Sequence, residues 1–535
     1  MLYIQTNNVI LENPKTKLQA TKQQQAVINL ALTGADITVE AYAGAAKTTT
    51  LVMVVEELAK LGKKGMYVAY NKAIATEASR EFNSTCECRT IHSLAYRSLP
   101  NNLKSKLTLK PKWASDYAKK FNFKPMYIPL RGQPDDVKMV SVNAFWTLVR
   151  ECVANYCRSS DESIARKHFQ KEEWMWTHDY MIDGLVDQVV NVAKKYWEEM
   201  CNPKSDVPIT HDFYLKQYAL SNEELVIDYL LLDEAQDCNP VMVQIVERYK
   251  GQKILVGDRY QNIYGFNKTM NIMDNDIGTK LALSKSFRFG NAVQDLANVI
   301  LTYRGNETPL EGNGDDKAVR YFTQPESFIP DAIICRTNSG VIESIFECMD
   351  KYPDCSIKAT VDVKNITSFI YSYLALEKGE MKEVKHPLLF GFKNFADLTD
   401  YLQDSPDPDI KKYDELMKRV GATRIIAAMT KCEKSGDADI LITTAHKSKG
   451  LTLGNVIIHS DFQYKLKTKS GVTELKISDD ELNLIYVAIT RAKKDIVITN
   501  IADLIAHLHK ENTTRIMEIN REFRKVINDN VGFKI

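Results

Sequence analysis

The sequence predicts an α/β protein with two parallel-sheet cores, each interrupted by an inserted segment. Two sets of short apolar runs alternate with helix-like segments, the pattern produced by parallel sheets that helices cover. The chain has 535 residues, too many for one hydrophobic core at roughly 150 residues per domain. Apolar residues make up 44% of the chain and charged residues 26%, which excludes a mostly disordered protein.

Four apolar runs and one turn predict the first core. The expected strands span residues 37–42, 66–69, 226–232 and 253–256, and a helix from Lys47 to about Leu61 follows the turn after the first strand. The run at 226–232 has the composition of a strand buried on both faces. We assign residues 1–99 and 226–278 to this core, and residues 100–225, which hold all five tryptophans, to a helical insertion.

A second set of apolar runs predicts the second core. The expected strands span residues 332–335, 440–443, 456–459 and 495–499. We assign residues 279–344 and 436–535 to this core. Residues 345–435 mix helix-like runs with turn signals, which predicts an insertion into the second core.

Charge and targeting signals leave the choice of partner open. The 70 Lys and Arg residues nearly balance the 69 Asp and Glu residues, and a neutral chain can still present a local basic groove. The first residues lack the pattern of a signal peptide, and no apolar stretch reaches the ~18 residues that a membrane span needs. We therefore expect a cytoplasmic protein whose ten cysteines are free thiols.

The segment AYAGAAKTTT at 41–50 has most features of a phosphate-binding loop. Such a loop needs converging backbone N–H groups, a lysine for the β- and γ-phosphates, and a hydroxyl for Mg²⁺. Lys47 and Thr48 fit the last two roles, but Ala46 stands where the full pattern has glycine. Its methyl can crowd the path of the phosphates or disfavour a backbone angle that only glycine takes easily. A plain strand–turn–helix with a surface lysine is the alternative. The expected nucleotide contacts here are Gly44, Ala46, Lys47, Thr48 and Thr49.

The segment DEAQD at 233–237 places two acids at the carboxyl end of the third strand. Ligands bind at this edge in open α/β sheets. Asp233 can hold Mg²⁺ through water, and Glu234 can orient and deprotonate an attacking water. Asn239 and Pro240 are predicted as the N-cap and first residue of the next helix. The alternative is that both acids serve only as capping groups.

Eight segments, in order, resemble the motifs of superfamily 1 DNA helicases of the UvrD/Rep/PcrA type. The resemblance is closest to the F-box DNA helicase branch, although no F-box segment is expected in this chain. Any single motif is weak, but their order along nearly the whole chain is specific. The segments are TKQQQAV at 21–27, AYNKAIATEA at 69–78, TIHSLAY at 90–96, DEAQD, VGDRYQNIYGF at 256–266, SFRF at 286–289 followed by RTN at 336–338, TTAHKSKGL at 443–451 and YVAITRAKK at 486–494.

The resemblance implies two RecA-like P-loop NTPase cores that use ATP and Mg²⁺. It implies that Gln24 contacts the adenine and that Phe287 stacks on it. Arg288 and Arg491 are placed like the two arginines that reach the γ-phosphate from the second core, where such an arginine can be worth ~10³–10⁵ in rate. Gln261 has an amide that can sense the γ-phosphate. Without the family, a surface ion pair is an equal alternative for each arginine.

The resemblance also implies contacts with single-stranded DNA. Tyr264 and Phe266 can stack on bases, each worth ~1–3 kcal/mol, although core packing is the more ordinary role for aromatics just past a strand. The two histidines among the expected contacts are not proposed as catalytic bases. The expected DNA contacts are Tyr70, Asn71, Lys72, Thr90, His92, Tyr264, Phe266, Thr444 and His446.

Residues 104–124 form a lysine-rich segment within the first insertion. Seven lysines alternate here with Trp113, Tyr117, Phe121 and Phe123, and Asp116 is the only acid. Basic residues among aromatics suit a nucleic-acid surface. A solvated helix face over a local core is an equally good interpretation.

The predicted function is that of an ATP- and Mg²⁺-dependent single-stranded DNA translocase and DNA helicase. The family implies 3′→5′ movement, action at junctions of single and double strands, and partners in repair, recombination or replication. Ala46 leaves open a nucleotide- and DNA-binding protein that hardly hydrolyses ATP, and a translocase that strips proteins from single strands is a further alternative. Thr452 stands where motif V usually has Glu, which puts ribose selectivity in question. A bacterial or viral source is expected.

Overall fold

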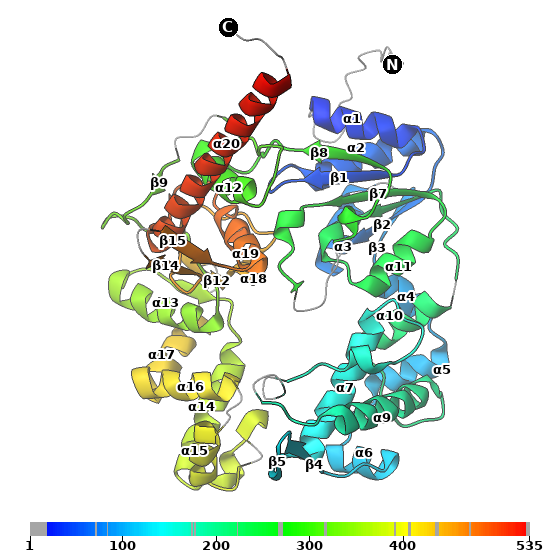
Figure 1. Cartoon of the computed structure of the whole chain (residues 1–535), viewed down its shortest axis with the longest axis vertical. Helices are drawn as coiled ribbons and strands as arrows, with labels where there is room; N and C mark the ends of the chain where they lie inside the picture. The colour runs from blue at the N-terminus through cyan, green and yellow to red at the C-terminus, as the bar shows by residue number, and fades with distance from the viewer. Residues whose placement is uncertain are drawn as a thin grey trace. The chain divides into compact units, whose positions relative to one another are not determined.

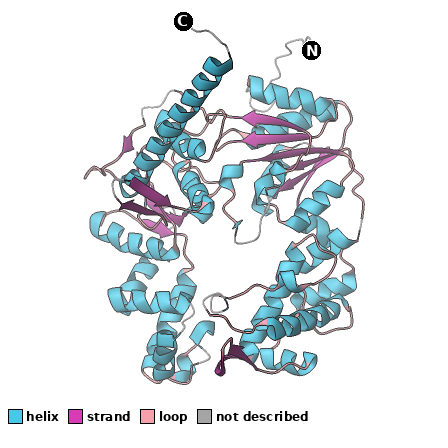
Figure 2. Cartoon of the chain, viewed as in Figure 1, coloured by secondary structure: helices cyan, strands magenta, loops and turns pink. Residues whose placement is uncertain are grey.

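The computed structural model contains two compact units. It describes residues 19–69, 72–82, 84–172, 175, 178–221, 223–265, 271–314, 318–389, 392–404, 408–433, 438–469 and 472–530. The first unit comprises Met1–Ala41 and Ala46–Leu283, and the second comprises Tyr42–Ala45 and Ser284–Ile535. Each unit holds a six-stranded sheet among helices, as Figure 2 shows. The predicted α/β class with two RecA-like cores is confirmed.

The first sheet is parallel throughout. Its strand order is β3-β2-β6-β7-β1-β8. All four predicted strands of this core are present. The strands are β1 (Ile37–Ala41), β2 (Gly65–Ala69), β3 (Cys86–Thr90), β6 (Tyr229–Leu232), β7 (Gln252–Gly257) and β8 (Thr279–Leu283).

Two boundaries of the first core differ from the prediction. Strand β8 pairs with β1, so the first core extends to Leu283 rather than ending at residue 278. Strand β6 begins at Tyr229 rather than at residue 226, and the Val226 side chain is 97% exposed. The Asp228 carboxylate accepts the Lys64 N–H at 2.7 Å, so this polar residue lies at the strand entry instead of inside the sheet.

Helices cover the first sheet and continue into the insertion. Helix α1 packs on α2, β1 and β8, as can be followed in Figure 1. Asn239 caps α11 and Pro240 occupies its first turn, as predicted. The core helices are α1 (Lys22–Leu32), α2 (Lys47–Lys60), α3 (Lys72–Glu81) and α11 (Pro240–Arg248). Helix α4 (Ile91–Ser98) follows β3 directly and leads into the insertion. The inserted elements are α5 (Asn101–Lys104), α6 (Ala114–Phe121), β4 (Met126–Leu130), β5 (Gln133–Val140), α7 (Val142–Arg158), α9 (Asp183–Cys201) and α10 (His211–Leu220).

The insertion shares a hydrophobic core with the sheet. One cluster of buried residues joins Met66 and Leu230 of the sheet to Phe145 and Val189 of helices α7 and α9. Because the apolar cluster is continuous, the insertion is packed against the first core rather than attached by a linker.

Two buried lysines fix loops of the insertion. The Lys106 ammonium donates to the carbonyls of Glu199, Met200 and Asn202 at 2.7, 2.9 and 2.7 Å, where α9 ends. It therefore pairs carbonyls that a helix end leaves without partners.

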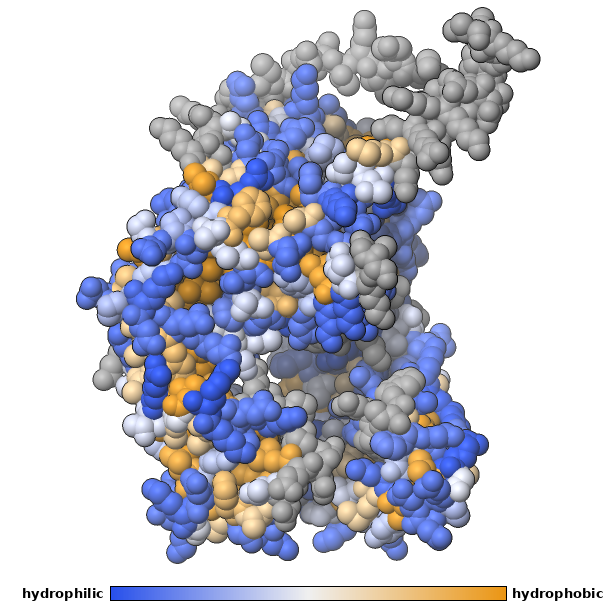
Figure 3. Space-filling model, turned by 60° about the vertical axis from the view of Figure 1, so that its left-hand side comes forward, coloured by the Kyte–Doolittle hydropathy of each residue, from blue (hydrophilic) through white to orange (hydrophobic). Residues whose placement is uncertain are grey.

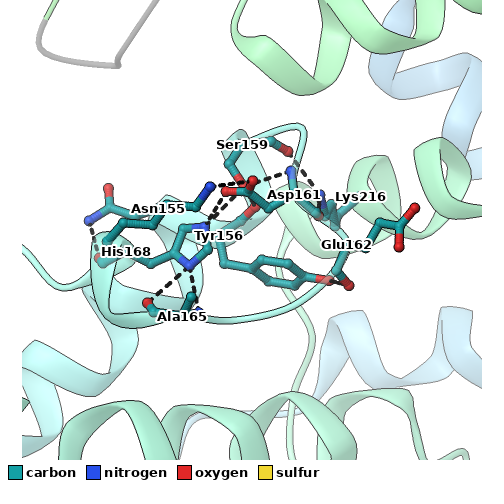
Figure 4. Close-up of polar contacts among 9 residues, drawn as sticks. Asn155, Tyr156, Ser159, Asp161, Glu162, Ala165, His168 and Lys216 are labelled. Atoms are coloured by element: carbon teal, nitrogen blue, oxygen red, sulfur yellow. Dashed lines mark hydrogen bonds and ion pairs between the residues drawn. The ribbon is translucent and has the colours of Figure 1, made fainter. Parts of the chain in front are cut away.

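The second buried lysine, Lys216 of α10, holds the loop that follows α7 (Figure 4). Its ammonium donates to the carbonyls of Ser159 (2.8 Å) and Asp161, and lies 4.6 Å from the centre of the Tyr156 ring. His168 closes the same loop through its Nε2 atom, 2.8 Å from the Asp161 carboxylate. Burial lowers the pKa of Lys216 to about 8, because carbonyls and a ring face compensate only part of the lost hydration.

The second sheet is also parallel throughout. Its strand order is β11-β12-β10-β13-β16-β9, and the four strands predicted for this core are present with small shifts at their ends. The strands are β9 (Arg320–Tyr321), β10 (Ala332–Cys335), β11 (Ile357–Ala359), β12 (Ile440–Thr444), β13 (Val456–Ile458) and β16 (Ile496–Val497).

Helices of the second unit divide into a core set and an inserted set. The core helices are α12 (Asn291–Tyr303), α13 (Asn338–Lys351), α18 (Ala445–Ser448), α19 (Asp479–Ile489) and α20 (Ala502–Asn530), with α20 beside α12 in Figure 1. An antiparallel hairpin of β14 (Lys465–Lys469) and β15 (Val472–Lys476) precedes α19. The inserted helices are α14 (Val363–Glu377), α15 (Phe395–Asp404), α16 (Pro408–Val420) and α17 (Ala422–Glu433).

The predicted insertion at 345–435 began too early. It included the end of α13 and strand β11, which belong to the second core because β11 pairs with β12. Strand β11 has only three residues, too few for a clear period-two pattern in the sequence.

The face in Figure 3 is mostly hydrophilic, with hydrophobic patches between the hydrophilic residues. All ten cysteines are free thiols, as expected. No helix among the described residues is both long enough and apolar enough to cross a bilayer.

Candidate functional site

The loop between β1 and α2 has a special backbone at two residues. Gly44 has φ +77°, and an added Cβ would overlap Ser286 and Arg288, which are grouped with Gly44 in the second unit. Ala46 has φ 54° and ψ 45°, in the left-handed region, and Lys47 then opens α2. The prediction that this position needs a backbone angle natural to glycine is therefore confirmed. Holding an L-residue in that region costs about 1–2 kcal/mol.

Lys47 lies among carboxylates at the start of α2. Its ammonium is 3.3 Å from Glu234 Oε1. Burial lowers the pKa of Lys47, but attraction to Glu234, Asp233 and Asp258 outweighs burial and leaves that pKa raised. Lys47 is therefore a charged group at neutral pH, and the alternative of a plain surface lysine is excluded by this geometry.

Asp233 and Glu234 follow β6 directly and differ in their surroundings. Asp233 is 5% exposed, and its Oδ1 atom accepts the Glu234 N–H at 2.9 Å. Burial, and then repulsion by Glu234, raise the pKa of Asp233. Glu234 has φ 52°, and its Oε2 atom accepts a hydrogen bond from Gln236 Nε2 at 2.6 Å. The buried Asp233 and the strained Glu234 are more than capping groups for the next helix, whose cap is Asn239.

A chain of hydrogen bonds joins these acids to the end of β7. Gln236 Oε1 accepts the Asp258 N–H at 3.0 Å, and Asp258 Oδ2 accepts from Gln261 Nε2 at 2.7 Å. Burial and the nearby Glu40 carboxylate raise the pKa of Asp258 to about 6. Sequence reasoning found Gln261 but missed Asp258 and Gln236. Asp258 had the same signal as Asp233, a polar residue directly after a strand, whereas Gln236 lies further along and had no such signal.

Gln24 is connected to the same loop through Thr50. Its Oε1 atom accepts the Thr21 N–H at 3.0 Å, and its Nε2 atom donates to Thr50 Oγ1 at 3.0 Å. The Thr50 hydroxyl in turn donates to the Ala46 carbonyl at 3.0 Å. A ligand that bound the Gln24 amide would therefore contact a side chain that is connected, through the Thr50 hydroxyl, to the backbone of the loop.

The donor set at this edge fits a magnesium–nucleotide. Lys47 offers an ammonium for phosphates, and Thr48, half-buried beside it, offers a hydroxyl. Asp233 offers a carboxylate with oxygen lone pairs, the type of ligand that Mg²⁺ prefers. Thr48 and Asp233 are thus the residues that could hold the cation, and the neighbouring Thr49 is also half-buried.

The predicted arginines of the second unit lie together around Thr490. Arg288 donates from Nη1 to the Thr490 carbonyl at 3.0 Å. Arg491 is only 1% exposed and donates to the Val487 carbonyl at 2.9 Å and to Thr490 Oγ1 at 3.1 Å. Because Arg491 is buried, a surface ion pair does not explain it.

Phe287 is close to the loop residues that belong to the second unit. Its N–H donates to the Gly44 carbonyl at 2.8 Å, and its ring is 46% exposed. In the same unit, the Ala43 N–H donates to the Tyr486 hydroxyl at 3.2 Å. An exposed ring held by its own backbone is suited to stacking on a flat ligand.

Two of the predicted DNA contacts serve as helix caps. The Thr90 hydroxyl accepts the Ser93 N–H at 3.1 Å where β3 meets α4. The Thr444 hydroxyl accepts the Lys447 N–H at 3.3 Å where β12 meets α18. Both residues therefore lie at the carboxyl ends of parallel strands, the edge where ligands bind, with their hydroxyls engaged in caps.

The other predicted DNA contacts differ in exposure. Lys72 is exposed, and Tyr264 and His446 are half-buried, so Tyr264 is not a fully buried core residue. Burial lowers the pKa of His92, whose ring meets the Tyr214 ring edge-on. Tyr70, Asn71 and Phe266 lie outside the described residues.

The lysine-rich segment packs a local core, which is one of the two interpretations that the sequence allowed; its use as a nucleic-acid surface stays a prediction. Tyr117, Phe121 and Phe123 are buried, and Tyr117 stacks on Trp146 with ring centres 4.1 Å apart. Trp113, at the start of α6, is 80% exposed. The segment therefore forms a local core and leaves one tryptophan in solvent among exposed lysines.

Comparison with known proteins identifies the family. A model of the UvrD-like helicase C-terminal domain matches residues 202–503, more than half of the chain, and a model described as an AAA domain matches residues 23–267. The chain therefore belongs to the UvrD-like helicase family.

Two eukaryotic relatives match nearly the whole chain. F-box DNA helicase protein 1 of Schizosaccharomyces pombe is 28% identical over 528 residues, which cover 91% of this chain and 58% of that protein. F-box DNA helicase 1 of Gallus gallus is 29% identical over 547 residues, which cover 94% of this chain and 51% of that protein. The chain thus spans about half the length of these relatives.

Two further matches are more limited. A probable DNA helicase II homolog of Mycoplasma pneumoniae is 32% identical over 102 residues, which cover 17% of this chain and 14% of that protein. A solved structure titled "The structure of PRRSV helicase" is 12% identical and has a TM-score of 0.28, covering 88% of this chain and 53% of that one.

Proposed function

We propose that this chain is an ATP- and Mg²⁺-dependent DNA helicase that moves along single-stranded DNA. The observation that supports this most is the half-buried ion pair of Lys47 and Glu234 beside the buried Asp233, at the carboxyl edge of a parallel sheet. Family membership, and relatives that are named DNA helicases, support DNA as the substrate.

Nucleotide binding would rearrange the Lys47–Glu234 pair. Lys47 would turn from Glu234 to the phosphates, because its ammonium cannot bind the Glu234 carboxylate and the phosphates equally closely at the same time. Glu234 would then be available to orient the attacking water and accept its proton. Mg²⁺, held by Thr48 and Asp233, would neutralise charge that develops on the phosphates.

The second core would supply the arginines. In this proposal one ATP lies between the two cores, Gln24 and Phe287 contact its base, and Gln261 senses its γ-phosphate. Arg288 and Arg491 stabilise the transition-state charge. Hydrolysis then depends on closure of the cores, which couples it to movement. The order of the motifs supports these roles.

Single-stranded DNA would be bound by phosphate contacts and stacked bases. The residues assigned to this role are Tyr70, Asn71, Lys72, Thr90, His92, Tyr264, Phe266, Thr444 and His446. Such contacts carry little sequence information, so the substrate is defined by its form, single strands and fork junctions. Movement in the 3′→5′ direction, and partners from repair, recombination or replication, follow from the family and belong to the proposal.

Phosphate release, measured with and without single-stranded DNA, tests the enzymatic proposal. Wild type should hydrolyse ATP faster when DNA is added, and Glu234→Gln should lose about 10²–10⁴-fold because it lacks the general base. Glu57→Gln, which alters another Lys-paired glutamate of the first unit, is a matched control and should hydrolyse normally. A wild-type rate no higher than that of Glu234→Gln would refute the proposal.

Ala46 favours a second candidate function. Its strained backbone is compatible with a chain that binds nucleotide and DNA but hydrolyses ATP slowly.

A third candidate function keeps the ATPase activity but removes proteins from single-stranded DNA instead of unwinding duplex DNA. A forked-duplex assay beside a displacement assay on protein-coated single strands distinguishes unwinding from stripping.

A further inference from the structure

A buried phenol contacts the carboxylate that the proposed function assigns to Mg²⁺. Tyr67 lies within β2, its side chain is fully buried, and its hydroxyl donates to Asp233 Oδ2 at 2.6 Å. Its ring packs against Phe82, with ring centres 4.9 Å apart. Core packing explains the ring but not the hydroxyl, since phenylalanine would fill this space without burying a polar group.

The register of the sheet brings the phenol to this carboxylate. Strand β2 pairs with β6 in parallel, and Tyr67 lies opposite Leu231, two residues before Asp233. A strand rises by about 3.3 Å per residue, so the side chain must reach along the sheet to the strand end. Tyrosine is long enough to span this distance and to end in a hydrogen-bond donor.

The two oxygens of Asp233 are held from two directions. Oδ2 accepts from Tyr67, and Oδ1 accepts from the Glu234 N–H at 2.9 Å. Rotation of the carboxylate would break one of these bonds, and the bond from the phenol is short. A carboxylate has about four lone-pair sites, so each oxygen can still accept from a water bound to a cation.

Resting on the proposed function, we infer that Tyr67 is a positioning residue that orients Asp233 toward the hydrated Mg²⁺ of the bound nucleotide. It touches neither the nucleotide nor the cation and acts through Asp233. Hydrogen-bond partners of metal-binding side chains typically contribute 10–100-fold to metal affinity or activity.

The test compares two Tyr→Phe variants of the full chain. Tyr67→Phe removes the bond to Asp233. Tyr229→Phe is the matched control, because Tyr229 is equally buried in the neighbouring β6 and lies at the end of that strand away from Asp233. A fluorescent ATP analogue is bound without Mg²⁺ and then titrated with MgCl₂, and thermal unfolding verifies that each variant is folded.

Tyr67→Phe should raise the half-saturating Mg²⁺ concentration by about 10–100-fold, with Mg²⁺-free binding of the analogue within about two-fold of wild type. Tyr229→Phe should change neither quantity. An unchanged Mg²⁺ dependence in folded Tyr67→Phe would overturn this inference but would leave the proposed function standing. Equal loss of binding with and without Mg²⁺ would also overturn it, because it would indicate general damage to the site.

A double-mutant comparison tests whether Tyr67 acts through Asp233. In an Asp233→Asn background, a residue that acts through Asp233 has nothing left to orient. Adding Tyr67→Phe should therefore shift the Mg²⁺ dependence no further, whereas an additional shift of tenfold would overturn the inference. If the wild-type chain binds no nucleotide at all, the proposed function fails as well.

Discussion

Ala46→Gly tests whether the unusual residue of the loop limits turnover. Ala46 is in the left-handed region, and its carbonyl accepts both the Thr50 N–H and the Thr50 hydroxyl at 3.0 Å. This conformation costs alanine about 1–2 kcal/mol, and glycine avoids that cost. Glycine loses roughly 0.5–1 kcal/mol through its more flexible unfolded chain. The net gain is about 0.5–1 kcal/mol, or about two- to five-fold in an equilibrium at 1.36 kcal/mol per tenfold.

The loop already has the shape that glycine would give it, so the rate of the chemical step should change little. Ala46→Gly should unfold at a slightly higher temperature. It should bind ATP within about two-fold of wild type, because the backbone strain is present before nucleotide binds and is the same in the free and bound states. Its DNA-stimulated kcat should stay within about five-fold of wild type. Titration calorimetry and phosphate release measure these quantities. Ala45→Gly is the matched control, because Ala45 has no positive φ and should gain nothing.

A hundredfold rise in the kcat of Ala46→Gly would refute this reasoning. It would indicate that the Ala46 methyl obstructs the reacting phosphate, and that the natural chain is a nucleotide-binding protein with impaired hydrolysis. Weaker ATP binding by Ala46→Gly would also contradict the account, because relief of backbone strain should not reduce affinity.

Four further changes have defined outcomes. Lys47→Ala should abolish phosphate release and weaken ATP binding, because it removes the ammonium that offsets three neighbouring carboxylates; unchanged calorimetric affinity would count against its role. Arg491→Lys keeps a charge but loses the guanidinium fork, so hydrolysis should slow while nucleotide affinity holds; normal turnover would reject a catalytic arginine. Trp113→Ala should weaken binding to a forked DNA by about 1–3 kcal/mol without changing thermal stability. Equal affinity of the variant and wild type in fluorescence anisotropy would show that the exposed ring does not contact DNA. Lys216 has a pKa of about 8 when folded and 10.5 as its ordinary value, so the unfolded chain binds more protons between these pH values. The contribution of Lys216 to the free energy of unfolding, measured relative to Lys216→Met, should therefore be constant below pH 8. Above pH 8 this contribution should rise by up to about 1.4 kcal/mol per pH unit. Urea unfolding in which this contribution falls as the pH rises would contradict the predicted sign.

The sequence predicted the elements whose signals are local. Strand β6 and the acids after it were found because an apolar run ends abruptly in two carboxylates. Helix α11 was found because Asn239 and Pro240 are typical of a helix start. Strands β3 and β8 were missed, since each lies at an edge of the first sheet and carries polar residues that break the apolar pattern.

Features that depend on distant contacts could not be predicted in the same way. The bond from Tyr67 to Asp233 joins residues 166 positions apart and depends on the register of two strands. The burial of Arg491 depends on the packing of its helix end, so the sequence left a surface ion pair open. The sequence also could not predict which aromatic residues of the lysine-rich segment are buried. That depends on which of them pack against Trp146 in the folded insertion.

Movement along single-stranded DNA tests the central claim most directly. Oligonucleotides of increasing length carry a fluorophore at the 5′ end, and stopped-flow fluorescence follows arrival of the protein after ATP and Mg²⁺ are added. The account predicts an arrival time that lengthens in proportion to the oligonucleotide and a signal that disappears in Glu234→Gln. Arrival that is independent of length, or equally fast without ATP, would contradict it.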